Sequence, residues 1–184
     1  VFAAGNSSDD VANRSPQNMT NPKPVVVAAS TQTDVPTFFT SFGMLVDVTA
    51  PGGGIENPPP TFDPYRNILS LKSSTCNASM CDPRLIVGTQ YVRQAGTSMS
   101  APHAAGAAAL IAAYRPTFTN ENIRQVLRAS ADDIGSPGFD IYNGAGRINA
   151  SLAVLTESVL NVKITSPLSG STPLGRTVTF YGTA

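Results

Sequence analysis

The chain has 184 residues and contains little charge, one histidine, two cysteines and no tryptophan. Charged residues make up 13% of the sequence, about half the usual share for a soluble protein. Twelve basic residues balance twelve acidic ones, so no field of one sign attracts nucleic acid or an anionic membrane surface. The longest strongly apolar run, residues 104–113, is too short to span a bilayer. We therefore expect no nucleic-acid partner and no membrane-spanning segment.

Apolar residues make up 41% of the sequence, which is enough to build a core despite the low charge. Three short apolar runs, at residues 1–4, 25–29 and 44–48, are typical of strands buried on both faces of a parallel sheet. Residues 7–24 show no period and are predicted to form a loop. Shorter strands are predicted on either side of the two cysteines, at residues 67–71 and 88–94.

Two helices are predicted after these strands. The first covers residues 98–115 and shows no polar face between residues 104 and 113, so we expect it to be buried all round. The second begins after Thr119, a good N-cap residue. It carries an apolar set with helical spacing: Phe118, Ile123, Val126 and Leu127. Strands followed by helices in this way predict an α/β fold.

The sequence pattern changes after about residue 158. Residues 162–167 and 177–182 alternate with the period of half-exposed strands and are separated by a turn rich in Gly, Pro and Ser. Because two strands cannot bury a core alone, we expect the chain to enter a second, all-β module of immunoglobulin-like type. The predicted organisation is a first domain over residues 1–158 and the opening strands of another over residues 159–184.

Ser98 is placed where the first helix begins, in the context Gly96-Thr97-Ser98. Backbone N–H groups at a helix N-terminus are unpaired, and the positive end of the helix dipole points outward. These features suit a nucleophile whose transition state carries a developing oxyanion. From this context alone, the simpler interpretation is that Ser98 is an ordinary N-cap and Gly96 a turn residue.

Residues 96–103, Gly-Thr-Ser-Met-Ser-Ala-Pro-His, closely resemble the active-site serine signature of subtilisin-like serine peptidases. Three further segments resemble motifs of that family in the family's order: Ala3-Ala4-Gly5-Asn6, residues 47–52 and residues 144–150. The resemblance covers about residues 1 to 155. It implies the C-terminal half of a subtilisin-like peptidase domain, with a mainly parallel sheet and flanking helices.

The resemblance also implies roles for individual residues. Ser98 would attack the scissile peptide carbonyl, and its backbone N–H would hold the oxyanion together with the side-chain amide of Asn6. The Thr97 hydroxyl would assist nearby, and Thr97 belongs to the expected substrate-binding residues. One wall of the pocket for the substrate residue before the cut would be formed by Ala3, Ala4 and Gly5. From the resemblance to this family we expect a polypeptide substrate and no cofactor for the chemistry. We also expect a secreted, extracellular protein.

The triad Asp and His of this family precede the oxyanion Asn, which is residue 6 here. We therefore expect the N-terminal half of the domain to be missing and the chain to be inactive alone, which also explains the lack of an initiator Met. His103, the only histidine, belongs to the serine signature and is expected to be a packed structural residue.

Two other functions are considered. The main alternative is a pseudopeptidase that acts as a binding or scaffold protein, and the upstream sequence would decide between the two. An acid-acting relative with a carboxylate base is disfavoured by the Met99 to His103 continuation of the signature.

Cys76 and Cys81 are five residues apart, and a zinc site would need two more ligands than this pair supplies. In a secreted protein we expect them to form a disulfide, whereas a reducing compartment would leave two thiols. The family commonly binds calcium for stability, so structural calcium is an expectation for the full-length protein. No metal ligand is assigned here, because Asp47, which matches a position near a weaker cation site, is expected to be a surface carboxylate.

Overall fold

A computed structural model describes residues 1–54, 63–76, 82–158, 163–166 and 181–183. Its centre is a parallel sheet of three strands in the order β1-β2-β3, where β1 is Phe2–Ala3, β2 is Val26–Ser30 and β3 is Val48–Pro51. Ala3 pairs with Val27, and Val27 pairs with Val48. The mixed α/β fold with a parallel sheet predicted from the sequence is confirmed.

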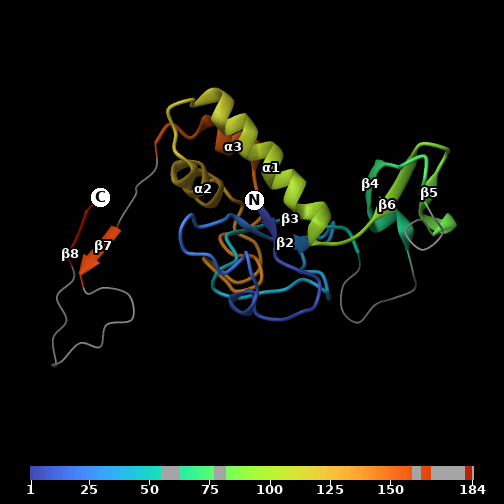
Figure 1. Ribbon diagram of the computed structural model, residues 1–184, viewed down its shortest axis with the longest axis horizontal. Helices are drawn as coiled ribbons and strands as arrows, with labels where there is room; N and C mark the ends of the chain where they lie inside the picture. Colours follow the sequence, from blue (N-terminus) through green and yellow to red (C-terminus); the bar gives the residue numbers. More distant parts are fainter. Residues whose placement is uncertain (55–62, 77–81, 159–162, 167–180, 184) are drawn as a thin grey trace.

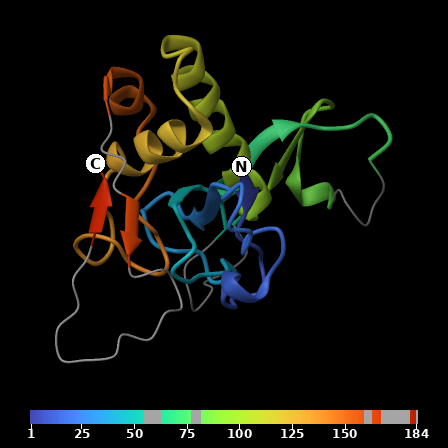
Figure 2. The same cartoon turned by 60° about the vertical axis from the view of Figure 1, so that its left-hand side comes forward.

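Strand β2 is buried along its whole length because both of its faces are covered. Val25 and Val27 pack with residues of three helices, whereas Val26 and Ala28 pack with Ala4, Val11 and Val46 on the opposite face. Figures 1 and 2 show the helices on one side of the sheet and the loops of the first 45 residues on the other. A continuous apolar run instead of an alternating one is what this double coverage requires.

Two of the predicted strands are displaced or less buried than expected. The third strand begins at Val48 instead of residue 44, and Met44 is 70% exposed. Residues 145–148 run beside β3 and extend the sheet at that edge. The N–H of Ala145 donates to the Asp47 carbonyl, and the N–H of Ile148 donates to the Thr49 carbonyl. Phe2 in β1 is exposed, because β1 is the edge strand of the described sheet.

Helix α1 (Thr97–Tyr114) lies on the sheet with one apolar stripe, formed by Ala104, Ala107 and Ile111. The prediction that this helix is buried all round is wrong for the structure. Leu110 is 48% exposed and Tyr114 is 62% exposed, because the sheet and the other helices contact only one side of α1. Its uniformly apolar composition therefore leaves an exposed apolar face.

Helices α2 (Asn120–Ala129) and α3 (Ala150–Leu155) complete the layer above the sheet. The predicted N-cap of α2 is confirmed: Thr119 accepts a hydrogen bond from the Asn122 N–H, and the Asn122 side chain bonds back to the Thr119 N–H. Val126 and Leu127 are buried in the core, as the apolar spacing predicts.

Asp47 is 2% exposed and lies directly before β3, so the expectation of a surface carboxylate is wrong. Its Oδ1 accepts a hydrogen bond of 2.5 Å from Nη2 of Arg124, and its Oδ2 accepts one of 3.0 Å from the Val26 N–H. Arg124, on the inner side of α2, is itself 4% exposed. A buried charge is tolerated only when it is paired and hydrogen-bonded in this way.

A second sheet projects from the domain beside the start of α1 (Figure 1). It is antiparallel, with the order β4-β6-β5, and consists of β4 (Ile68–Leu71), β5 (Ile86–Val87) and β6 (Tyr91–Gln94). The sequence predicted β4 closely, but the strand predicted at residues 88–94 joins β6 with the turn before it and leaves out β5. Short 3₁₀ helices occur at Val11–Asn13, Pro64–Arg66 and Pro83–Leu85.

The C-terminal region contains β7 (Lys163–Ser166) and β8 (Tyr181–Thr183), which pair antiparallel. Residues 159–162 and 167–180 lie outside the described part of the chain. The division into domains at residue 158 and the all-β module therefore stay predictions. Within the described residues, no helix has the length and apolarity needed to cross a membrane.

Candidate active site

Ser98 lies in the first turn of α1, where the helix meets the carboxyl end of the sheet. The N-cap is Gly96, whose φ of +154° falls in a region that favours glycine, and whose N–H donates to the Gly52 carbonyl just after β3. This bond ties the helix N-terminus to the sheet. Ser98 is exposed, and among the described residues neither its hydroxyl nor its backbone N–H has a hydrogen-bond partner.

Asn6 follows β1 and is held by Thr97, 91 residues later in the sequence. The Asn6 Oδ1 accepts two hydrogen bonds, one of 2.9 Å from the Thr97 N–H and one of 2.8 Å from the Thr97 hydroxyl. Because an N–H can only donate, these bonds identify Oδ1 and so fix the orientation of the amide. The Nδ2 group has no hydrogen-bond partner in the described part of the chain. It lies close to Gly96, since a Cβ added there would be 3.3 Å from it.

Thr97 is completely buried, so its side chain is behind the site and not on the surface that a substrate would contact. Its hydroxyl donates to Asn6 and accepts a hydrogen bond of 3.1 Å from the Gly5 N–H. One side chain thus connects the end of β1 with the start of α1. The Thr97 hydroxyl and backbone N–H hold the Asn6 side chain in place.

The segment Ala3 to Gly5 is fixed by its backbone. The N–H of Ala4 donates to the Val27 carbonyl, and the carbonyl of Ala3 accepts a bond of 2.7 Å from the Gln17 side chain. Because the Ala4 side chain is buried in the core, this residue can border a substrate only through its backbone. Gly5 has a φ of +115°, a conformation that side chains disfavour.

A polar network that the sequence analysis missed supports Gly5 from behind. The Ser41 N–H donates to the Gly5 carbonyl, and the Ser41 hydroxyl donates to Asp9 at 2.7 Å. Arg14 donates to both carboxylate oxygens of Asp9. These hydrogen bonds from Arg14 and Ser41 lower the pKa of Asp9 to about 2. Asp9 and Ser41 are 32 residues apart, and no local pattern indicates that they meet.

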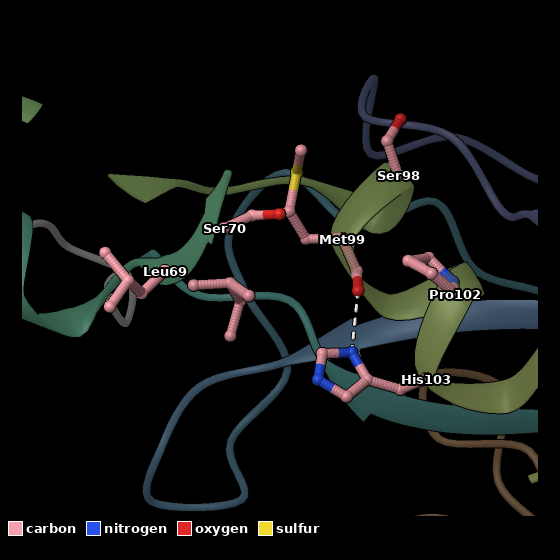
Figure 3. Close-up of a pocket in the computed structure, with 7 residues that line it drawn as sticks. Leu69, Ser70, Ser98, Met99, Pro102 and His103 are labelled. Carbon is pink, nitrogen blue, oxygen red and sulfur yellow. Dashed lines mark hydrogen bonds between the residues drawn. The ribbon is translucent and has the colours of Figure 1, made fainter. Parts of the chain in front are cut away.

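A cavity of about 310 Å³ opens beside Ser98, between α1 and β4. Figure 3 shows Met99, Pro102 and His103 on the helix side and Leu69 and Ser70 on the strand side. The His103 Nδ1 is 2.7 Å from the Met99 carbonyl oxygen, which can only accept, so Nδ1 carries the proton. The Ser98 hydroxyl points away from the His103 ring (Figure 3). His103 is exposed, so the expectation that it is packed is wrong.

The remaining predicted site residues lie elsewhere. Cys76 forms a disulfide, and its expected partner, Cys81, lies outside the described residues. In the described part of the chain, no group of three or more His, Cys, Asp or Glu side chains could hold a metal ion. The Arg124 guanidinium already neutralises Asp47, which is the carboxylate that the sequence analysis weighed as a neighbour of a cation site.

The geometry places a nucleophile candidate, an unpartnered amide and the N-terminus of a helix at one edge of a parallel sheet. A profile of the subtilase family matches residues 1–146. The chain belongs to the subtilase family.

Among the most similar curated relatives, an extracellular protease of Xanthomonas campestris is 32% identical over 84% of this chain. Thermitase of Thermoactinomyces vulgaris is likewise 32% identical over 84% of the chain. Among solved structures, a protease of Pseudoalteromonas arctica is similar with a TM-score of 0.66 and 30% identity, over 84% of this chain and 41% of that one. A lanthipeptide protease is similar with a TM-score of 0.69 and 25% identity, over 83% of this chain and 49% of that one.

The chain covers only part of each of these relatives. It spans 23% of the Xanthomonas protein and 43% of thermitase. Their family membership supports serine peptidase chemistry, whereas the activity of a whole protein built on this chain is a matter for proposal.

Proposed function

We propose that this chain supplies the nucleophile and the oxyanion-binding groups of a serine endopeptidase. The Ser98 Oγ bonds to the carbon of the scissile peptide carbonyl, and its proton passes to a base. The C–N bond then breaks, the amine leaves with a proton, and Ser98 keeps the acyl group until water releases it. The carbonyl oxygen carries negative charge in the tetrahedral state between these steps.

One observation carries the proposal: Thr97 occupies the Oδ1 of Asn6 with two donors and so leaves its Nδ2 to donate to another molecule. The Ser98 N–H, in the first turn of α1, is the second unpaired donor of the site. Fixed donors of this kind stabilise developing charge without reorganising during the reaction. If Asn6 only capped a loop, its amide would not have to be held by a buried residue 91 positions away.

The base is proposed to come from outside this chain. His103 is the only histidine, and it uses Nδ1 to bond the Met99 carbonyl while the Ser98 hydroxyl points elsewhere. A serine without a base within hydrogen-bond reach is a weak nucleophile. We therefore propose that the triad Asp and His lie on a preceding N-terminal half of the domain, and that the chain alone is inactive.

The substrate is proposed to be a polypeptide bordered by Ala3, Ala4 and Gly5, and the reaction requires no cofactor. The similarity to the extracellular protease of Xanthomonas supports secretion as part of this proposal. Structural calcium in the full-length protein stays an expectation, and no residue here is assigned to it.

A fluorophosphonate probe, which forms a covalent bond with an activated serine, tests the proposal. We expect the chain alone to be labelled no faster than its Ser98→Ala variant. We expect Ser98 to be labelled rapidly in a longer protein that adds the preceding half with an Asp and a His. Rapid labelling of the chain alone would contradict the proposed origin of the base. A longer protein that stays unlabelled would favour the pseudopeptidase alternative.

A further inference from the structure

A second polar pocket lies at the opposite edge of the parallel sheet, where the amino ends of β2 and β3 meet α2. Its volume is about 180 Å³, and its lining includes Lys23, Met44, Asp47, Arg124, Arg128 and Phe139. Three of these side chains are cationic, and one is an anion. The pocket lies at the amino end of the sheet, whereas Ser98 and Asn6 lie at the carboxyl end. It is therefore separate from the proposed peptidase site.

The buried pair Asp47 and Arg124 uses up most of its own hydrogen-bonding capacity. Both Asp47 oxygens are occupied, by Arg124 and by the Val26 N–H. The Nη1 of Arg124 donates a hydrogen bond of 2.9 Å to the Glu121 carboxylate. Asp47, the only carboxylate in the pocket lining, is therefore already paired with Arg124. The other two cations, Lys23 and Arg128, form no hydrogen bond with it.

Arg128 and Lys23 have no hydrogen-bond acceptor among the described residues. The Arg128 Nη1 is 3.8 Å from the Asp47 Oδ1, beyond hydrogen-bond length, and its guanidinium lies 5.9 Å from the centre of the Phe139 ring. The Lys23 pKa is lowered, first by partial desolvation of the ammonium group and then by repulsion from Arg124, with a smaller repulsion from Arg128. The pull of Asp47 in the other direction does not cancel these effects.

We propose that this pocket binds a small oxyanion, a carboxylate or inorganic phosphate, between Lys23 and Arg128. Two oxygen atoms of such an ion would accept charge-assisted hydrogen bonds from the two cations that lack acceptors. Phe139 would keep the Arg128 guanidinium in place, and Met44 would shield one side of the ion from water. The proposal does not depend on Ser98 or on any residue that would supply a triad.

The test is a titration of the chain with sodium phosphate and, separately, sodium acetate, against sodium chloride at the same ionic strength. NMR of the Lys23 side chain gives both the dissociation constant and the Lys23 pKa. We expect saturable binding that raises this pKa, because a bound anion favours the charged ammonium. Saturation with phosphate alone identifies phosphate as the ligand, saturation with acetate alone identifies a carboxylate, and both results support the site.

Variants locate the ion. In the variants, the backbone amide signals of the pocket residues replace the Lys23 side chain as the reporter of binding. Lys23→Met and Arg128→Met should each weaken binding about tenfold, through loss of one charge-assisted hydrogen bond. Lys72→Met removes the same charge at the residue after β4, a strand that lies far from α2 (Figure 1), and should leave the constant unchanged. Lys23 is exposed, so its replacement spares the fold even where that of Arg128 does not. Equal effects of Lys23→Met and Lys72→Met, or shifts identical to those with chloride, would overturn the proposal.

Discussion

The two ends of the parallel sheet use polar residues in opposite ways. At the carboxyl end, Asn6 and Ser98 are exposed and keep unpaired donors. At the amino end, Asp47 and Arg124 are buried and bonded to each other. Ligands of open α/β sheets bind at the carboxyl ends of the strands, and the unpaired donors of Asn6 and Ser98 are found there. Exposed groups with unpaired donors indicate function at the carboxyl end, whereas the buried ion pair at the amino end indicates a structural role.

The largest effect on stability is expected from Arg124→Met at the amino end. Asp47 would stay buried without its main partner, which costs about 3–5 kcal/mol of unfolding free energy. Urea denaturation measures this loss. The control is Arg84→Met, which breaks an exposed pair with Asp82 and should cost far less stability, because solvent screens such pairs.

A double variant sharpens this prediction. Adding Asp47→Asn to Arg124→Met removes the buried charge, while an amide oxygen can still accept from the Val26 N–H. We expect much of the lost stability to return. A double variant that is no more stable than Arg124→Met would show that the buried charge is not the cause.

A smaller effect is expected from Thr97→Val at the carboxyl end. Valine removes the hydroxyl, which is one of the two donors to Asn6 and the acceptor of the Gly5 N–H, while the Thr97 N–H still donates to Asn6. The expected cost is about 1–3 kcal/mol of unfolding free energy. In an active, longer protein the misplaced Asn6 should also lower kcat more than it changes KM. Thr97→Ser should restore both quantities. Thr117→Val, at an exposed position, is the matched control for stability. An unchanged kcat in Thr97→Val would contradict the positioning role.

The smallest effect is expected at the Asp9 network. The pKa of the Asp9 carboxyl group is depressed from 3.8 to about 2. The contribution of Asp9 to folding stability is therefore complete above pH 4 and is lost as the pH falls through about 2. Carbon-13 NMR of the Asp9 carboxyl group measures this midpoint. Arg14→Met should bring the pKa back toward its ordinary value. A midpoint near 3.8 in the unmodified chain would refute the network. Because the pair is exposed, the stability change should be small.

Local patterns predicted much of the fold. The continuous apolar run before Ser30 indicated a doubly covered strand, and Thr119 indicated the start of α2. The errors arose where burial depends on distant residues. The exposed side of α1 has the same alanine-rich composition as its buried side, so no period distinguishes the two. Asp47 looked like a surface residue because its partner, Arg124, is 77 positions away.

The candidate site was predicted by its motifs and not by its geometry. Ser98 and Asn6 were identified from the segments that resemble a family, and the family is confirmed by the match over residues 1–146. Neither segment reveals that Thr97 is buried or that it orients the Asn6 amide. The Asp9 and Ser41 support was missed for the same reason, because contacts across the fold leave no local signal.

The central claim is that the Asn6 amide, oriented by Thr97, binds the oxyanion formed on attack by Ser98. The most direct test is the kcat of Asn6→Ala in a longer, active protein, with Asn13→Ala as the control at an exposed position in a 3₁₀ helix. We expect kcat to fall about 10²–10³-fold with little change in KM; this range is the one known for the corresponding asparagine of a subtilisin and is taken over from that relative. A kcat within about threefold of the parent enzyme would contradict the claim.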